Sequence, residues 1–471
     1  MKELAGTPSL AVPVPGTDAG GLSLAFSIPE GFSFRYFAET NRIVPTGTFP
    51  AGEVPVASAR GGTLSGGIRN WRERSPLFPD GMVKNLTLEM TQQCNMRCAY
   101  CLYSGNYDNR RRHGDVAMDS ATIAAAIRLY VSLNRNRPAA HVSFYGGEAL
   151  LEFGKIRDAV DLARTLAVPR PLTFGISTNG LLLDDEVGSW LDDNPDVSVL
   201  VTLNGPFQDD FRRDRSGGKT LAPILRNLGR LKSGHPDVWA SRVRFVCNVA
   251  SLDQILPMRD FFAAEIGKVP IAITNIVPYH GNDFINSLVR HDRENRESVW
   301  RDLAEEYLET GDPFLHVLFR IRLSNVLERP IIAPGTPGET QTCHPLEDSL
   351  FVSADGTLSL CERCGCLSVG TVGQGVDESV LSTVFDDAFR AFRAKCGSCW
   401  AQRLCSVCVA NVDGIGTDNP NVSDAFCRNE KANVLEDLRL FCRMALFHPD
   451  AMSKLFPDSI HSTNAKEVCH P

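Results

Sequence analysis

The sequence has no stretch that is long and apolar enough to cross a membrane as a helix. None of its apolar runs reaches the roughly 18 residues that such a helix needs. The first residues also lack the charged segment and apolar core of a secretory signal. Basic residues are not in excess either, because 48 Lys and Arg are outnumbered by 56 Asp and Glu, a net charge of −8. We therefore expect a cytoplasmic protein whose main partner is neither a nucleic acid nor a membrane, and we expect the basic run at 110–112 to be a solvated loop.

What the chain has in quantity is cysteine, with 15 residues. Without a secretion signal these cysteines are not expected to form disulfides, because the cytosol keeps thiols reduced. Metal or cluster ligation is the better interpretation. The cysteines fall into a tight loop of three, a spaced set of seven between 343 and 427, a pair at 364 and 366, and three isolated residues at 247, 442 and 469.

The tight loop is Cys94-x3-Cys98-x2-Cys101, and it follows an alternating run, 86–90, that is typical of a half-buried strand. Structural zinc takes four ligands and cubane clusters usually have four, so three thiols suggest an iron left open for a ligand that is not protein. A half zinc site completed from elsewhere, or buried free thiols, is the simpler alternative. The spacing resembles that of the radical S-adenosylmethionine (SAM) enzymes, whose CxxxCxxC loop holds a [4Fe–4S] cluster with SAM on the fourth iron. The resemblance implies both cofactors here, with Cys94, Cys98 and Cys101 as the cluster ligands.

Between residues 85 and about 277, strand-like and helix-like segments alternate six times. A helix between the first two strands is expected to be capped by Asp119 or Ser120 and to place Ile123, Ile127, Tyr130 and Val131 on one face. Alternating strands and helices imply parallel pairing with right-handed crossovers, and six units fit an open barrel better than a closed one of eight. The predicted fold class is therefore α/β, a partial (β/α)6 barrel with a C-terminal cysteine-rich domain, and the resemblance implies that the barrel is of the radical SAM type. The strands are expected at 85–91, 141–145, 172–178, 197–204, 242–250 and 270–277.

Polar motifs follow the next strand ends, where functional loops of such a fold gather. Gly146-Gly147-Glu148 allows close backbone approach to a ligand and offers a carboxylate to an ammonium group. It resembles the GGE element that binds the methionyl amine of SAM in the radical enzymes. Ser177 and Asn179 suit ribose hydroxyls and lie in a stretch that resembles the STNG element of the peptide- and sulfatase-maturing branch.

The fourth strand end departs from the pattern of that branch. Thr202-Leu-Asn-Gly-Pro206 resembles its S-x-D-G-P element, but Asn204 replaces the Asp, which leaves a charge-dependent role there in doubt. The stretch 209–213 matches the HDxxR-like stretch of the same branch without its His. A solvated charged loop explains 209–213 almost as well.

The spaced set of cysteines runs Cys-x12-Gly-x4-Cys, then Cys-x2-Cys-x5-Cys-x2-Cys, and ends in a separate cysteine. The inner four could serve one zinc. With the non-local cysteines, the set resembles the SPASM domain, the auxiliary-cluster extension of radical SAM enzymes that mature peptides, although that domain usually has x3 where this chain has its last x2. By positional match the resemblance implies two auxiliary [4Fe–4S] clusters, the first held by Cys343, Cys361 and Cys408, and the second by Cys396, Cys399, Cys405 and Cys427.

The first auxiliary cluster would need one more ligand. Cys364 or Cys366 could supply it, or an iron could stay open for a substrate thiolate. By the same resemblance, Glu362 would act as a general base near the substrate, and a surface carboxylate beside a cluster loop is the alternative.

These motifs divide the chain into five expected parts. Residues 1–84 form an N-terminal extension with a hairpin at 32–44, either a leader-peptide recognition unit or a disordered lead followed by an edge strand. Residues 85–300 form the barrel, 301–342 a helical bridge, 343–430 the SPASM domain, and 431–471 an amphipathic helix with a loose tail.

The Cys399-Trp-Ala stretch most resembles the maturases of Cys-rich or CXXX-repeat ribosomal peptides, the thioether-forming ranthipeptide type. The resemblance implies an oxidoreductase with three [4Fe–4S] clusters that cleaves SAM to a 5′-deoxyadenosyl radical. Hydrogen abstraction would then lead to a thioether, carbon–carbon or carbon–oxygen crosslink in a precursor peptide that carries a leader, with flavodoxin or ferredoxin as electron donor. Side-chain oxidation of the sulfatase-maturase kind and a non-enzymatic zinc-binding interaction protein are the alternatives.

Overall fold

The computed structural model describes residues 23–38, 42–46, 83–107, 111–166, 171–276, 283–328, 346, 348–365 and 367–457. Within these residues, six parallel strands follow one another in chain order across one sheet. They confirm the predicted alternation, with ends that differ from the expected ones by a few residues. The strands are β4 (Asn85–Thr91), β6 (Ala140–Gly146), β7 (Leu172–Thr178), β8 (Val197–Thr202), β10 (Val243–Val249) and β11 (Ala272–Asn275).

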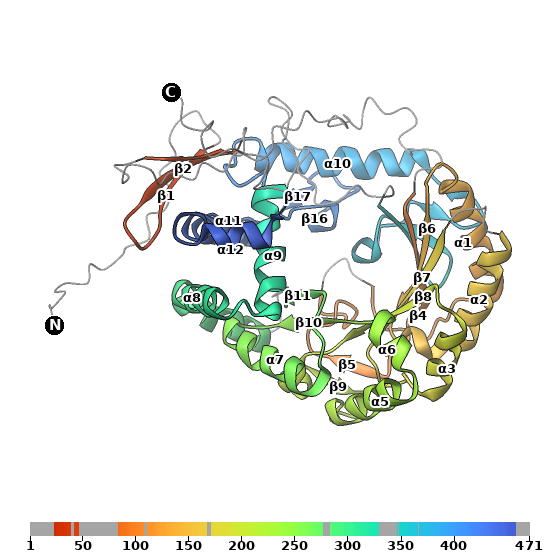
Figure 1. Ribbon diagram of the computed structural model, residues 1–471. Coiled ribbons are helices and arrows are strands. Elements are labelled where there is room, and N and C mark those ends of the chain that lie inside the picture. The colour runs from red at the N-terminus through yellow and green to blue at the C-terminus, as the bar shows by residue number, and fades with distance from the viewer. Residues whose placement is uncertain are drawn as a thin grey trace.

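Helices cover the outer face of this sheet (Figure 1). The predicted cap of α1 is confirmed, because the Thr122 backbone N–H donates to Asp119 Oδ1 at 2.7 Å. Side chains along β6 are alternately buried and half-buried, and the buried set, such as Val142, packs against α1 and α2. The helices are α1 (Ser120–Leu133), α2 (Phe153–Leu166), α3 (Asp185–Asp193), α5 (Leu221–Gly234), α6 (Pro236–Arg242) and α7 (Ile255–Phe261).

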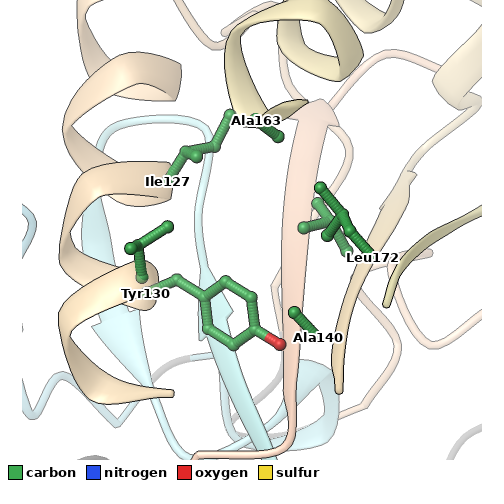
Figure 2. Close-up of a pocket in the computed structure, with 7 residues that line it drawn as sticks. Ile127, Tyr130, Ala140, Ala163 and Leu172 are labelled. Atoms are coloured by element: carbon green, nitrogen blue, oxygen red, sulfur yellow. The ribbon is translucent and has the colours of Figure 1, made fainter. Parts of the chain in front are cut away.

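The helix-to-sheet interface leaves a gap of about 10 Å³ between α1, α2 and the sheet (Figure 2). Its lining is apolar except for Tyr130, whose hydroxyl donates to the Lys84 carbonyl at 2.6 Å and accepts from the His141 N–H at 2.9 Å. A gap of about one water volume with no spare polar group is a packing imperfection of the core and not a ligand site.

The sheet continues beyond the six strands into the C-terminal part of the chain. β12 (Ser349–Val352) pairs in parallel with β4, and Leu350 lies opposite Leu86. Antiparallel pairing then adds β13 (Thr357–Ser359), β14 (Gly370–Thr371) and β15 (Gly375–Val376). β12 covers the edge of β4 that would otherwise be open. The loop that carries Cys361 follows β13, so it starts from the same sheet as the barrel.

Two long helices lead to the C-terminal part, α8 (Asp283–Thr310) and α9 (Pro313–Glu328). They contact α11 (Asp424–Phe447), which is followed by α12 (Pro449–Leu455). We expected the last helix to begin near residue 431, but Ser423 caps it by accepting from the Phe426 N–H at 3.2 Å. This earlier start places Cys427 in the first turn of α11.

The predicted N-terminal hairpin is confirmed and has a third strand. β2 (Ser33–Phe37) pairs with β3 (Arg42–Pro45) on one side and β1 (Ser23–Ser27) on the other, all antiparallel. The small sheet docks on α11, where Arg443 bonds to Glu30 at 2.6 Å. Among the residues described, no helix combines the length and apolar character that crossing a membrane requires.

Candidate active site

The three-cysteine loop lies at the C-terminal end of β4, where the predicted topology places it. Its middle forms β5 (Met96–Cys98), which pairs antiparallel with β9 (Arg212–Asp214), so that Cys98 lies opposite Arg212. Burial, with a smaller contribution from the neighbouring thiols of the loop, raises the pKa of the Cys94 thiol to about 11 and that of Cys101 to about 12. Thiols with such pKa values stay protonated at neutral pH unless a cation binds, so this set fits a metal or cluster that displaces the protons.

The glycine pair after β6 holds this loop from the side. The Gly147 N–H donates to the Thr91 carbonyl and the Glu148 N–H to the Gln93 carbonyl, both at 2.8 Å. A Cβ on Gly147 would lie 2.0 Å from the Gln93 oxygen, and one on Gly146 would lie 2.4 Å from the Thr91 oxygen. Gly146 also has a φ of +133°. We expected these glycines to allow close backbone approach to a ligand. In this structure their backbone instead lies close to the segment that leads into Cys94.

Glu148 lies beneath the loop and is only 1% exposed. Its carboxylate accepts hydrogen bonds from the Thr178 hydroxyl at 2.7 Å, the Asn179 N–H at 2.8 Å and the Leu150 N–H at 3.2 Å. Burial raises its pKa, and these donors oppose the rise. Since two carboxylate oxygens offer about four acceptor positions, one remains for an external cation such as an amine.

Asn179 connects the third strand end to the cysteine loop. Its side-chain amide donates to Asn95 Oδ1 at 2.7 Å and lies 3.9 Å from the Cys94 sulfur. Ser177 is half-buried on β7. Thr178, which the sequence reasoning did not single out, is the hydroxyl residue of this stretch that binds Glu148. Alternation along a strand places Thr178 and Ser177 on opposite faces, and only the register of β7 decides which one meets Glu148.

Asn204 acts as a hydrogen-bond donor at the fourth strand end. Its amide nitrogen donates to the Tyr100 hydroxyl at 2.9 Å, and the same oxygen accepts from Arg212 at 3.1 Å and Asn248 at 3.2 Å. A carboxylate could not donate, so the amide fits this position where the family pattern has Asp. Tyr100 and Asn248 escaped the sequence reasoning, although the aromatic residue between Cys98 and Cys101 was a usable signal, whereas Arg212 lies in the stretch 209–213 that the sequence analysis considered.

The stretch 209–213 is not the solvated charged loop that we considered. Asp209 accepts from the N–H groups of Thr220 and Leu221, at 2.6 and 3.0 Å, and so ties this stretch to the first turn of α5. Arg212 is 5% exposed, and its positive charge lowers the pKa of the Cys94 and Cys101 thiols. Its role is thus to hold and to polarise the cysteine loop.

The expectation of a solvated basic run at 110–112 is wrong for Arg111. Arg111 is 8% exposed and forms an ion pair with Glu89, a β4 residue that is 2% exposed. The guanidinium lies over the Tyr103 and Phe351 rings, 4.3 Å from each centroid, and donates to the Glu362 carbonyl at 3.4 Å. Arg112 is exposed, and residue 110 lies outside the described part. Arg111 therefore joins the three-cysteine loop to the Cys361 loop, which sequence spacing could not reveal.

Glu362, the predicted general base, lies in a 3₁₀ turn, Glu362–Cys364, directly after Cys361. It is half-buried, and its charge raises the pKa of both Tyr103 and Tyr145. Tyr145 comes from β6, and Tyr103 follows the three-cysteine loop. Burial is the main cause of both raised pKa values, and the contribution of Glu362 shows that its charge lies within electrostatic range of the two tyrosines.

The four cysteines predicted for the second auxiliary cluster line one cavity of about 110 Å³. Cys396 is the last residue of α10 (Glu378–Cys396), Cys399 and Cys405 come from the irregular segment after it, and Cys427 comes from α11. Burial raises the pKa of the Cys405 and Cys427 thiols. Four thiols around one cavity fit an iron–sulfur cluster, for which such a ligand set is usual.

The structure describes only part of the cysteine set that was predicted to hold the first auxiliary cluster. Cys361 and Cys408 are described, whereas Cys343 and Cys366 lie outside the described residues. Across the described residues, no three or more His, Cys, Asp or Glu side chains are arranged to enclose a single metal ion. Tetrahedral zinc needs its ligands within about 2.3 Å of one point, whereas a cubane spreads its thiolates over a larger body.

Comparison with known sequences finds a family match within the barrel. Residues 88–243 match the sequence profile of the Radical SAM superfamily. This part of the chain is therefore similar to a radical SAM domain. The matched segment contains the three cysteines, Glu148, Asn179 and Arg212, and so coincides with the site described above.

Several proteins share part of this sequence. The uncharacterized protein MJ0907 of Methanocaldococcus jannaschii is 30% identical over 33% of this chain and 50% of its own length. A GTP 3′,8-cyclase of Clostridium perfringens is 30% identical over 30% of this chain and 41% of its own. The mycofactocin maturase MftC of Mycolicibacterium smegmatis is 26% identical over 49% and 55%. The chain thus spans about half the length of the curated relatives that it matches.

The fold likeness extends over more of the chain than the sequence likeness. The structure of native anSMEcpe with bound AdoMet and Cp18Cys peptide superposes with a TM-score of 0.56 at 16% identity. The match covers 80% of this chain and 99% of that one, so the shared fold continues beyond residues 88–243.

Proposed function

We propose that this protein is a radical SAM enzyme that modifies a ribosomally made precursor peptide and forms a crosslink in it. The observation that carries the proposal is the combination of two thiol sites in one chain. A three-cysteine loop lies in the segment that matches the Radical SAM superfamily, with Glu148, Asn179 and Arg212 packed around it. Four further cysteines line a separate cavity. The sequence similarity to MftC, which is named a mycofactocin maturase, supports a peptide substrate.

The residues present fit the implied cofactors. Cys94, Cys98 and Cys101 would hold one [4Fe–4S] cluster, whose open iron would bind SAM. When bound, this pair of cofactors supplies a 5′-deoxyadenosyl radical for hydrogen abstraction. Cys396, Cys399, Cys405 and Cys427 would hold a second auxiliary cluster, and Cys343, Cys361 and Cys408 would contribute to a first.

The chain's own residues orient SAM and the peptide. Glu148 keeps an acceptor position for the methionyl amine, with Gly146 and Gly147 beside it, while Ser177 and Asn179 lie at the strand end proposed for the ribose. Arg212 and Asn204 hold Tyr100 between two cluster ligands and so limit the movement of the loop. Glu362 would accept a proton from the substrate.

The remaining partners follow from this chemistry. The three-stranded sheet β1–β3 would bind the leader of the precursor, and a flavodoxin or ferredoxin would supply electrons. A cluster of low reduction potential and its cysteine thiolates require reducing surroundings. For this reason we propose that the protein lies in the cytoplasm.

The test uses protein reconstituted without oxygen, with dithionite and SAM. Iron, sulfide and 5′-deoxyadenosine are measured for the parent and for a variant with Cys94, Cys98 and Cys101 all replaced by Ala. We expect about twelve irons in the parent and about four fewer in the variant, with nucleoside formed by the parent alone. Zinc with little iron and no nucleoside from either protein would instead indicate a zinc-binding interaction protein.

The reaction type is tested next with candidate precursor peptides. A crosslink removes a pair of hydrogens and joins two side chains, so fragmentation between those residues is suppressed in tandem mass spectrometry. An aldehyde product reacts with a hydrazine and fragments normally. Hydrazine-reactive product would replace the crosslinking proposal with side-chain oxidation.

A further inference from the structure

The two-stranded ribbon of β5 and β9 has one buried face. Met96, Cys98 and Arg212 occupy alternate positions of the two strands, with Cys98 directly opposite Arg212. Met96 is 1% exposed and Arg212 is 5% exposed. Because successive side chains of a strand point to opposite faces, the residues between these positions belong to the other face of the ribbon.

The other face of the ribbon carries three arginines. Arg97 and Arg213 lie directly opposite each other in the register of the two strands. Arg215 continues the pairing, since its N–H donates to the Asn95 carbonyl at 3.1 Å, and it lies two positions beyond Arg213 on the same face. Arg97 and Arg215 are exposed, and Arg213 is partly exposed. These three residues, 97, 213 and 215, are termed the basic face below.

The charge of the basic face is not explained by the stability of the ribbon. Like charges directly opposite each other across two strands are destabilising. The segments 95–98 and 212–219 contain five basic residues and one acidic residue, in a chain whose net charge is −8. The acidic residue is Asp214, whose Oδ1 accepts from the N–H groups of Ser216 and Gly218, at 2.8 and 2.7 Å. The positive charge is thus concentrated at this one place and faces solvent.

The basic face lies beside two of the three cysteines of the loop. Cys98 follows Arg97 in β5 and belongs to the buried face of the same ribbon. The pKa of His113 is lowered mainly by burial and also by the positive charges of Arg97 and Arg215, so both charges lie near this ring. The His113 Nε2 atom lies 3.7 Å from the Cys101 sulfur. A partner that covers the basic face therefore comes close to the cluster proposed for this loop.

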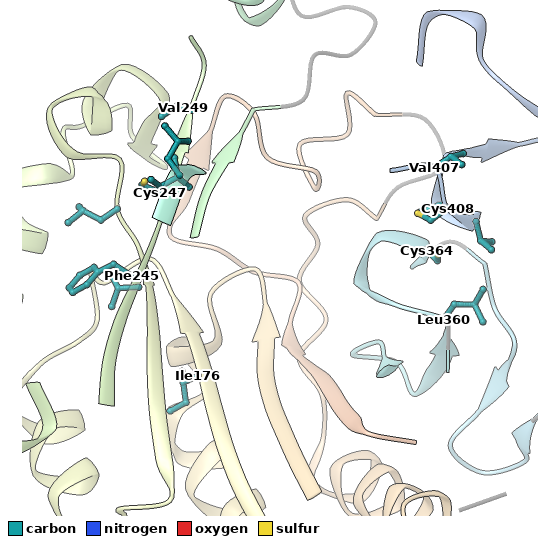
Figure 3. Packing of buried hydrophobic residues seen from close by; sticks show 14 of the residues in the cluster. Ile176, Phe245, Cys247, Val249, Leu360, Cys364, Val407 and Cys408 are labelled. Atoms are coloured by element: carbon teal, nitrogen blue, oxygen red, sulfur yellow. The ribbon is translucent and has the colours of Figure 1, made fainter. Parts of the chain in front are cut away.

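The cavity proposed for the second auxiliary cluster lies elsewhere in the molecule. Figure 1 shows β5 and β9 on one side of the molecule and α10, which ends at Cys396, on the other. Figure 3 shows Cys364 and Cys408 on C-terminal segments, apart from the barrel strand that carries Phe245 and Cys247. A partner on the basic face is thus beside the three-cysteine loop and not beside that cavity.

We propose that the basic face is the docking site of an acidic one-electron donor protein, of the flavodoxin or ferredoxin kind, which reduces the cluster of the three-cysteine loop. This inference rests on the proposed function, which supplies the cluster. Opposite charges steer such a partner to the face and fix its orientation. The transfer moves one electron from the reduced donor to the oxidised cluster and makes or breaks no bond. A short path favours this step, and the basic face is only the thickness of one ribbon from Cys98.

The first experiment measures binding and compares the reconstituted parent with the double variant Arg213→Glu/Arg215→Glu. A glutamate at 213 would face Arg97, so the ribbon should fold at least as well as in the parent. Isothermal titration calorimetry with flavodoxin, and separately with ferredoxin, gives the affinities. We expect the variant to bind at least about tenfold more weakly. Binding by the parent should also weaken as the ionic strength rises from about 0.01 M to about 0.15 M.

Formation of 5′-deoxyadenosine then separates docking from chemistry. With limiting flavodoxin, kept reduced by NADPH and flavodoxin reductase, the variant should form the nucleoside at least about tenfold more slowly than the parent. With saturating dithionite, a small reductant that needs no docking site, the two proteins should form it at the same rate.

A matched control carries the same change of charge on the outer helices. Arg128 in α1 and Arg226 in α5 are both exposed. The double variant Arg128→Glu/Arg226→Glu should bind flavodoxin like the parent, because its charges are changed away from the ribbon. Equal weakening in this control would show that only the net charge of the protein matters, and the inference would then be wrong.

Other results would also overturn the inference. Flavodoxin and ferredoxin that bind the Arg213→Glu/Arg215→Glu variant as they bind the parent, or that do not bind the parent, would do so. A short DNA duplex that binds the parent as tightly as the donor would indicate a general polyanion site. A slow reaction of the variant with dithionite would mean that the arginines support the loop itself. A parent that forms no nucleoside even with dithionite is a separate result, since it removes the proposed function.

Discussion

The two cysteine regions of this protein are built in different ways. The three-cysteine loop is held by protein contacts: β5 pairs with β9, the backbone after β6 bonds to residues 91 and 93, and Arg212 is buried beside the thiols. Around the second auxiliary site, residues 397–408 contain neither helix nor strand. The comparison indicates that the first region is preformed for its cofactors, while the second would depend on the auxiliary cluster proposed for it for much of its order.

Removal of one ligand from each region tests this difference most strongly. Cys405→Ala should lower the free energy of unfolding by about 5 kcal/mol or more, because cluster binding is coupled to the folding of its loops. Cys98→Ala should abolish 5′-deoxyadenosine formation and leave the unfolding transition nearly unchanged. Anaerobic chemical denaturation followed by circular dichroism measures both. Equal destabilisation by the two variants would remove the distinction.

Arg111 and Glu89 join the two regions, and breaking their ion pair should have the next largest effect. Arg111→Met leaves the Glu89 carboxylate buried without its partner, at a cost of about 3–5 kcal/mol in unfolding free energy. Adding Glu89→Gln should recover a large part of the loss, since the unpaired charge is then gone. Arg157→Met, in an exposed pair with Glu186, is the control and should cost less than about 1 kcal/mol. A double variant as unstable as Arg111→Met would show that the charge is not the cause.

Crowding beside the cysteine loop gives a third and smaller effect. Gly147→Ala places a methyl group against the Gln93 carbonyl and should cost about 1–3 kcal/mol, with loss of iron from the cluster proposed for the three-cysteine loop but not from the proposed auxiliary clusters. Gly229→Ala in α5 meets nothing within 4 Å and should raise stability by about 0.5–1 kcal/mol. Iron counts and thermal unfolding follow both variants, and equal iron in both would indicate that the glycine pair does not support the loop.

The smallest expected effect concerns SAM affinity, together with the loss of one of the hydrogen bonds that the Glu148 carboxylate accepts from buried donors. Glu148→Gln removes the negative charge from the acceptor proposed for the methionyl amine, and SAM should bind about tenfold more weakly, since a charge-assisted hydrogen bond becomes a neutral one. The cluster content should not change. Equilibrium binding of SAM to the reconstituted protein measures the affinity, and an unaltered dissociation constant would place the amine elsewhere.

The local pattern of the chain was sufficient for much of the fold and part of the site. Six strands, the cap of α1 and the N-terminal hairpin follow from hydrophobic periodicity and from turn and capping residues, which act over a few neighbouring positions. The grouping of Cys396, Cys399, Cys405 and Cys427 was predicted by spacing and resemblance, and these cysteines do line one cavity. Parallel strands also bring their C-terminal ends to one edge, so the order of the motifs was enough to bring Cys94, Glu148 and Asn179 together.

Other features depend on contacts between segments far apart in the chain, which no local pattern records. The pairing of β12 with β4, the burial of Arg111 against Glu89, and the contact between the 3₁₀ turns Glu362–Cys364 and Val409–Asn411 all join residues more than 20 positions apart. Whether Thr178 or Ser177 meets Glu148, and whether Asn204 donates to Tyr100, depends on the register of one strand and on the packing of one ring. Spacing along the sequence thus predicts which chemical groups are available, whereas tertiary packing decides which of them meet, because burial and hydrogen-bond geometry are set by all of the segments together.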